Sequence, residues 1–209
     1  LSSVVILASS TVDTGALSPF GDVIFYFRYP LSPYPLYCGS EIYSLNQGGP
    51  TVTNAGLSFA QDSGFRDIYL FGVDAGVRSP EYHHAKDSYH YTEDAIVVES
   101  DLRFDIKVPA NFGGTCWTSR GLYSARTNLI SAIKNHGQGR RVFNCSDGAL
   151  LDGAKPLRPG EMSLPDKASK KPKIVSDFIN GFSPLKQTNL NAKWPGAVIA
   201  KNINAYVKA

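Results

Sequence analysis

The sequence lacks most of the features that mark secreted, membrane-spanning or cysteine-based metal proteins. It has three cysteines in 209 residues, and Cys38, Cys116 and Cys145 are too widely spaced to form a CxxC pair or a cysteine–histidine metal site. No segment approaches the roughly 18 to 20 apolar residues of a membrane span, and the first ten residues lack the basic start of a secretion signal. We therefore expect three unpaired thiols and a cytoplasmic location.

Short motifs of several large enzyme classes are also missing. The sequence contains no GxGxxG dinucleotide-binding motif, no phosphate-binding P-loop, no GxSxG nucleophile motif and no HExxH zinc motif. Dinucleotide-dependent enzymes, NTPases, α/β-hydrolases and zinc peptidases therefore lose support as functional classes. We expect no cofactor.

Charge is distributed unevenly along the chain, although its net value is only +3. Residues 1–154 carry 11 basic and 15 acidic side chains, whereas residues 155–209 carry 10 basic and 3 acidic ones. The basic segment has no aromatic residues interleaved with arginine, so nucleic-acid binding has little support. We predict one domain over residues 1–157, followed by a basic, loosely structured or helical segment over residues 158–209.

Short apolar runs alternate with helical patterns, as in α/β proteins. The predicted strands are Val4–Ala8, Val23–Phe27, Ile68–Val73 and Val142–Cys145, and the predicted helices are Ala55–Gln61 and Thr118–His136. We expect these four strands to form one largely parallel sheet with helices on both faces. The sequence also suggests a strand pair at Ala95–Ser100 and Arg103–Val108, and short helices at Ile174–Phe182 and Ala197–Val207.

A loop before the first predicted helix offers groups that suit an anion. Gly48-Gly49-Pro50 cannot continue a regular element, and Thr51, Thr53 and Asn54 follow it at the helix start. Their hydroxyls and the free N–H groups of the first turn would favour an anionic ligand, aided by the helix dipole. An ordinary capped helix has the same chemistry, so structural capping is the alternative.

Polar residues follow two of the predicted strands. Asp74 comes just past Ile68–Val73, at the edge where open α/β sheets bind ligands, and it suits a ribose hydroxyl, a metal, a base or an ordinary turn. His83 and His84, with His90 nearby, are candidates for acid–base groups or metal ligands, or for polar loop residues with neither role. Because the Thr51 helix leads into the strand that ends near Asp74, we expect these groups to face one cleft.

Several of these stretches together resemble the bacterial motility accessory factor family, whose members are regarded as flagellin glycosyltransferases. The resemblance rests on Thr51-Val52-Thr53-Asn54-Ala55-Gly56, on Gly64 to Asp74, on His83-His84-Ala85 and on Val142 to Ala149, and it covers roughly residues 1–157. The predicted helix and strand are also similar to those of bacterial CMP-sialic acid-dependent sialyltransferases. These resemblances imply a Rossmann-like α/β domain that uses a CMP-activated nonulosonic acid, without a metal, and transfers the sugar to Ser or Thr of flagellin.

The resemblance also implies roles for particular residues. Thr51 and Thr53, with Asn54, would meet the carboxylate or phosphate of the donor. Asp74 and the strand-end residues Asn144, Ser146 and Asp147 would lie near the nucleotide.

Two departures from these families affect the expected chemistry. The Gly-Ser/Ala-Gly-Pro-Ser loop that holds the donor phosphate in these families is absent from the sequence. We therefore expect the chain to be the later part of the domain, and such a part would be inactive alone. The sialyltransferases place a histidine just before the second helix, where this sequence has Trp117-Thr118-Ser119, so His83 or His84 becomes the expected base. Two alternatives remain open: pyrophosphoryl transfer to a hydroxymethylpterin, and a non-catalytic module that binds flagellin or another partner.

Overall fold

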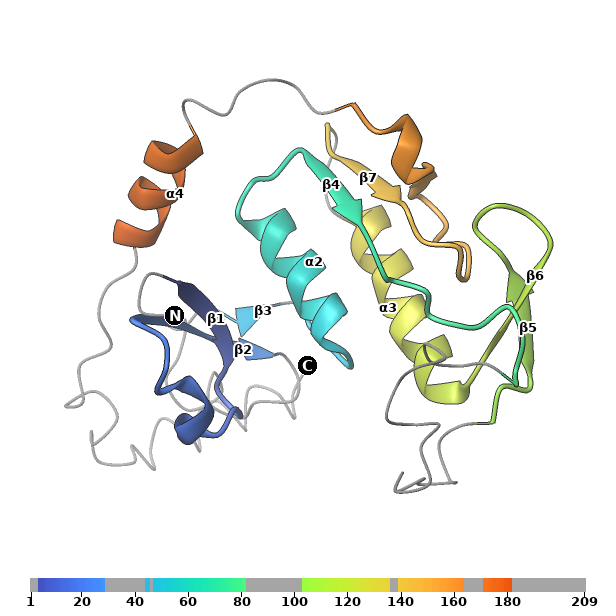
Figure 1. The fold of residues 1–209 in the computed structure, drawn as a ribbon, viewed down its shortest axis with the longest axis horizontal. Coiled ribbons are helices and arrows are strands. Elements are labelled where there is room, and N and C mark those ends of the chain that lie inside the picture. Colours follow the sequence, from blue (N-terminus) through green and yellow to red (C-terminus); the bar gives the residue numbers. More distant parts are fainter. Residues whose placement is uncertain are drawn as a thin grey trace, which may run out of the picture. The chain divides into compact units, whose positions relative to one another are not determined.

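The chain forms two compact units in the computed structural model, which describes residues 4–28, 44–45, 47–81, 103–135, 139–163 and 171–181 (Figure 1). One unit comprises Leu1–Ser44 and Ser163–Ala209, and the other comprises Leu45–Met162. The sequence suggests a division at residue 157 instead, and that division stays a prediction. All described candidate site residues belong to the second unit.

The first unit contains a small sheet with the strand order β1-β2-β3. Strands β1 (Val5–Ser9) and β2 (Asp22–Arg28) are parallel, and a short 3-10 helix, η1 (Thr14–Leu17), lies between them in the chain. The third strand is β3 (Ser44–Leu45). The predicted C-terminal helix is present as α4 (Lys171–Asn180), whereas Ala197–Val207 lies outside the described residues.

The second unit is built on the parallel sheet β4-β7-β8, with strands β4 (Asp67–Leu70), β7 (Arg141–Asn144) and β8 (Lys155–Pro156). Helices α2 (Val52–Asp62) and α3 (Arg120–Asn135) lie side by side and share a core with the sheet (Figure 1). Side chains alternate along the strands, so that buried residues of β4 and β7 face the helices. The main members of this core are Leu57, Ile68, Leu70, Leu129, Val142 and Leu151.

An antiparallel hairpin lies next to the carboxyl edge of this sheet. It consists of β5 (Ile106–Pro109) and β6 (Thr115–Thr118), and its turn contains Gly113 and Gly114 with φ of 94° and 77°. Val77 exchanges backbone hydrogen bonds with Trp117 at 2.7 and 2.8 Å, so the segment leaving β4 runs beside β6. A second, smaller core of Val108, Ala110, Cys116 and Ala149 holds the hairpin on the domain.

The α/β class and the mostly parallel pairing are confirmed, and the fold is consistent with a Rossmann-like domain. The expectation of one sheet is wrong for the described strands, because β1 pairs with β2 in one sheet and β4 pairs with β7 in another. The two α-helices described in the second unit, α2 and α3, pack on the same side of β4 and β7. The predicted partner strand Ala95–Ser100 lies outside the described residues, and β5 pairs with β6.

Strand β4 is shorter than predicted, and its early end shapes the site. It stops at Leu70, because Gly72 adopts φ of 65°, a conformation that ends an extended strand. Asp74 therefore lies on a bent exit segment and not directly at the strand's end.

In the described part of the chain, no helix is long and apolar enough to cross a membrane.

Candidate functional site

The start of α2 is organised by a capping box between Thr51 and Asn54. The Thr51 hydroxyl donates to Asn54 Oδ1 at 2.6 Å and accepts from the Asn54 backbone N–H at 3.4 Å. The Thr51 backbone N–H also donates to Asn54 Oδ1, at 3.3 Å. The Asn54 side chain is 1% exposed, and its Nδ2 donates to the Ala125 carbonyl of α3 at 3.0 Å. Asn54 therefore joins α2 to α3 as well as capping α2, and its contact with a ligand stays a prediction.

Other groups at the start of α2 are open to a ligand. Thr53 is half-buried and its hydroxyl makes no hydrogen bond with another described residue, while Val52 is 79% exposed. The N–H groups of a helix's first turn have no intrahelical acceptor. Asn128 Nδ2 donates to the Gly49 carbonyl at 2.9 Å and so fixes the preceding loop against α3. Backbone N–H groups and the Thr53 hydroxyl, held on a fixed loop, can accept an anion.

The exits of β4 and β7 cross at very short range. The Ala149 N–H donates to the Asp74 carbonyl at 2.6 Å, and the Val73 N–H donates to the Ser146 hydroxyl at 2.9 Å. A Cβ added at Gly148 would lie 2.1 Å from the Asp74 carbonyl oxygen, so only glycine permits this approach. The two predicted strand-end motifs are thus brought together.

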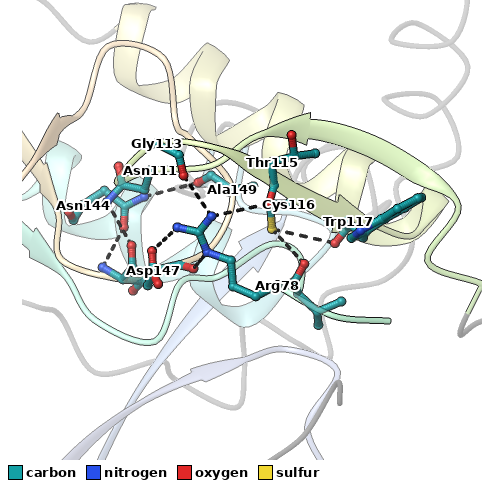
Figure 2. Close-up of polar contacts among 11 residues, drawn as sticks. Arg78, Asn111, Gly113, Thr115, Cys116, Trp117, Asn144, Asp147 and Ala149 are labelled. Carbon is teal, nitrogen blue, oxygen red and sulfur yellow. Dashed lines mark hydrogen bonds and ion pairs between the residues drawn. The ribbon is translucent and has the colours of Figure 1, made fainter. Parts of the chain in front are cut away.

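A buried amide network holds the crossing in place (Figure 2). Asn144 Oδ1 accepts from the Ser146 N–H at 3.1 Å, and Asn111 Nδ2 donates to the carbonyls of Asn144 and Ser146, both at 2.9 Å. Asn111 also donates its backbone N–H to the Gly148 carbonyl at 2.8 Å. Asn144 and Ser146 are 0% and 6% exposed, so the contacts that the structure gives them are internal. Their predicted contact with a nucleotide stays a prediction.

Two carboxylates remain at the surface of the crossing. Asp74 and Asp147 are both exposed residues. The pKa of the Asp74 carboxyl is nevertheless raised, first because neighbouring protein removes part of its hydration and second because Asp147 carries a like charge. The Asp147 carboxylate forms an ion pair with Arg78. Asp74 is therefore the carboxylate available for a ligand's hydroxyl groups.

Strand β6 also borders the site. Thr118 is fully buried and donates its hydroxyl to the Ala75 carbonyl at 2.7 Å, where Ala75 has a φ of 46° that non-glycine residues rarely adopt. Cys116 is also fully buried and lies 3.3 Å from the Val77 carbonyl, and burial raises the pKa of its thiol. Cys145 is likewise a free, buried thiol, whereas Cys38 lies outside the described residues.

The structure tests only in part whether the predicted site residues lie together. The structure brings Asp74, Asn144, Ser146 and Asp147 together at the exits of β4 and β7. Thr51, Thr53 and Asn54 lie at the start of α2. Helix α2 and strand β4 run in opposite directions, so this start lies toward the end of the sheet at which β4 exits (Figure 1). His83 and His84 lie outside the described residues. Among the residues that are described, no three histidine, cysteine, aspartate or glutamate side chains are grouped to hold a metal ion.

Sequence reasoning missed Arg78, Asn111 and Gly148. The first two act mainly on backbone carbonyls far away in the chain, such as those of Gly113 and Asn144. No local pattern encodes such partners. The Asp-Gly dipeptide at 147–148 signals a turn, but not the close approach of a second strand exit.

One solved structure supplies the functional comparison. It superposes on 91% of this chain with a TM-score of 0.73 and 33% sequence identity. The chain is similar to a MAf glycosyltransferase. That protein comes from Magnetospirillum magneticum AMB-1, and the chain spans 28% of the MAf glycosyltransferase chain. No family model and no curated protein matches the sequence.

Proposed function

We propose that the chain is a portion of a glycosyltransferase that moves a nonulosonic, sialic-like acid from a CMP-activated donor to Ser or Thr of flagellin. The observation that carries this proposal is the 33% identity to the MAf glycosyltransferase over 91% of the chain. The motility accessory factor motifs in the sequence support the donor and acceptor classes. The similarity to sialyltransferases remains part of the proposal.

Donor recognition would divide between the two halves of the site. The uncapped N–H groups at the start of α2, with the Thr53 hydroxyl, would bind the carboxylate or phosphate of the donor, and Thr51 would hold the cap that presents them, unless the ligand replaces Asn54 as the acceptor of the Thr51 hydroxyl. Asp74 would accept hydrogen bonds from the ribose hydroxyls. The Asn144–Asp147 turn would lie against the nucleotide, with Asn144 and Ser146 holding the turn in shape through their internal hydrogen bonds.

Transfer would proceed by displacement at the anomeric carbon. The acceptor hydroxyl oxygen attacks that carbon, its proton passes to a base, and the bond from the anomeric carbon to the phosphate oxygen breaks to release CMP. His83 or His84 is the proposed base, because both follow the exit segment of Asp74 in the chain. The stretch Trp117-Thr118-Ser119 offers no base, since the Thr118 hydroxyl is buried and donates to the Ala75 carbonyl.

The carboxylate arrangement favours this reaction over pterin pyrophosphorylation. A Mg²⁺-dependent phosphotransferase holds its metal with free carboxylates and substrate phosphates. Here Arg78 forms an ion pair with Asp147, so Asp74 is the one of the two exposed carboxylates at the crossing that is not paired with a described cation. The buried, unpaired thiols of Cys116 and Cys145 suit the reducing cytoplasm in which we place the protein.

A thermal-shift comparison of CMP against hydroxymethylpterin with ATP and Mg²⁺ tests the ligand class. We expect CMP to raise the melting temperature of the unmutated chain, and Asp74→Asn to weaken CMP binding about tenfold, the loss of roughly one hydrogen bond to a charged group. Asp67→Asn, which removes a carboxylate from the other end of β4, is the matched control and should bind CMP normally. A response to pterin with ATP and Mg²⁺ but not to CMP would replace the proposal with phosphotransfer.

Turnover tests the base. In the full-length enzyme, with flagellin as acceptor, His83→Ala or His84→Ala should lower the transfer rate by ~10²-fold or more with little change in donor affinity. If both variants transfer sugar at the unmutated rate, neither histidine is the base. Flagellin binding without a response to either nucleotide would identify a non-catalytic module.

A further inference from the structure

Arg78 makes an unusual set of contacts for a half-exposed arginine. Its Nε donates to the Asp147 carbonyl at 3.2 Å, and its Nη2 pairs with Asp147 Oδ1. Its Nη1 donates to the carbonyls of Gly113 at 2.9 Å and Thr115 at 3.4 Å (Figure 2). One guanidinium therefore ties the exit of β4 to the exit of β7 and to the β5–β6 turn.

This geometry excludes two simpler roles for Arg78. Its contacts use most of the directions in which a guanidinium donates, so it is not a free cation waiting for a phosphate. An exposed ion pair by itself contributes little to stability, and the side chains of Arg78 and Asp147 are 38% and 61% exposed. What distinguishes Arg78 is that three segments converge on it at the edge of the site.

We propose that Arg78 is the positioning residue of this site: it fixes Asp147 and the β5–β6 turn beside Asp74, so that the Asp74 carboxylate is held where it can accept the hydroxyls of a nucleotide ribose. The nature of the bound group rests on the proposed function, whereas the positioning does not. Arg78 touches no substrate in this role and acts through Asp147 and Asp74.

Two substitutions separate the hydrogen bonds of Arg78 from its charge. Arg78→Lys keeps a cation but cannot donate to Asp147, Gly113 and Thr115 together, because lysine lacks the planar fork. Arg78→Met removes the charge as well. The matched control is Arg141→Met, which removes another exposed arginine–aspartate pair, with Asp67, from the opposite ends of the same two strands.

Amide hydrogen exchange and CMP binding measure the positioning effect. In Arg78→Lys we expect faster exchange at Thr115 and Asp147 and a threefold to tenfold loss of CMP affinity, of the order of one weakened hydrogen bond. Exchange and affinity that match the unmutated chain overturn the proposal. If the unmutated chain fails to bind CMP, the proposed function fails, and the exchange data still decide the role of Arg78.

Discussion

Replacing Gly148 with alanine is expected to destabilise the second unit by about 2 to 5 kcal/mol. The new Cβ would lie 2.1 Å from the Asp74 carbonyl oxygen and 2.3 Å from its Cα, and both are backbone atoms that cannot rotate away. The two exits must separate, which breaks the hydrogen bond from Ala149 to Asp74 (2.6 Å) and weakens the one from Asn111 to Gly148 (2.8 Å). Each such bond contributes about 1 kcal/mol, and forced overpacking costs about 1 to 3 kcal/mol.

Urea denaturation followed by the fluorescence of Trp117 measures this loss. The chain has two tryptophans, so a Trp194→Phe background leaves Trp117, beside the crossing, as the reporter. With a typical urea dependence of about 2 kcal/mol per molar, the midpoint should fall by about 2 M. A loss of this size is a large fraction of the free energy of unfolding of a native domain, which is roughly 5 to 15 kcal/mol.

Gly56→Ala is the matched control for this experiment. Gly56 lies on the exposed side of α2, and an added Cβ there meets no atom within 4 Å. Alanine in a helix interior should stabilise by about 0.5 to 1 kcal/mol, so its midpoint should rise slightly. If Gly148→Ala unfolds at the same urea concentration as the unmutated chain, the close crossing of the two exits is refuted.

Three further outcomes are expected. Asn54→Ala should lower the free energy of unfolding by about 2 to 3 kcal/mol in urea titrations, because it removes both the cap of α2 and the hydrogen bond to α3; a loss no larger than that of a surface substitution would contradict this. The pKa of Asp74 is raised in the folded state, so its ionisation opposes folding and stability falls as pH rises above the ordinary aspartate value. Asp74→Asn should therefore raise the urea midpoint at pH 7 and leave it unchanged near pH 3, and a lowered midpoint at pH 7 would argue against it. Brief alkylation of the native chain should leave the buried thiols of Cys116 and Cys145 unlabelled. Alkylation after unfolding without reductant should give three labelled cysteines by mass spectrometry, including Cys38. A crosslinked pair would contradict the cytoplasmic assignment.

The elements that sequence predicted well are those with strong local patterns. The apolar stripe predicts a helix over Thr118–His136, and α3 spans Arg120–Asn135. β7 was also predicted within one residue of its end. The Thr51 cap was foreseen from residue type, because threonine after a Gly-Gly-Pro loop has few other roles. Local propensity and the fold agree at these places, so a single sequence is sufficient.

The elements that sequence missed depend on distant parts of the chain. Strand β6 is only four residues long. Its residue Trp117 pairs with Val77, which lies 40 residues earlier in the sequence. Asn144 and Ser146 read as exposed polar groups at a strand's end, but the crossing exit of β4 and the Asn111 side chain bury them. Which polar side chains face solvent was decided by those tertiary contacts.

The capping box at the start of α2 restricts how the protein can change over evolution. Asn54 serves two helices through one amide group, whose oxygen accepts from Thr51 and whose nitrogen donates to Ala125. A substitution at position 54 that preserves the cap but lacks a second donor, such as aspartate, would leave the Ala125 carbonyl without that partner. Positions 51 and 54 are therefore expected to vary together among homologues, with 54 confined to residues that both accept and donate, while the neighbouring position 52 drifts freely.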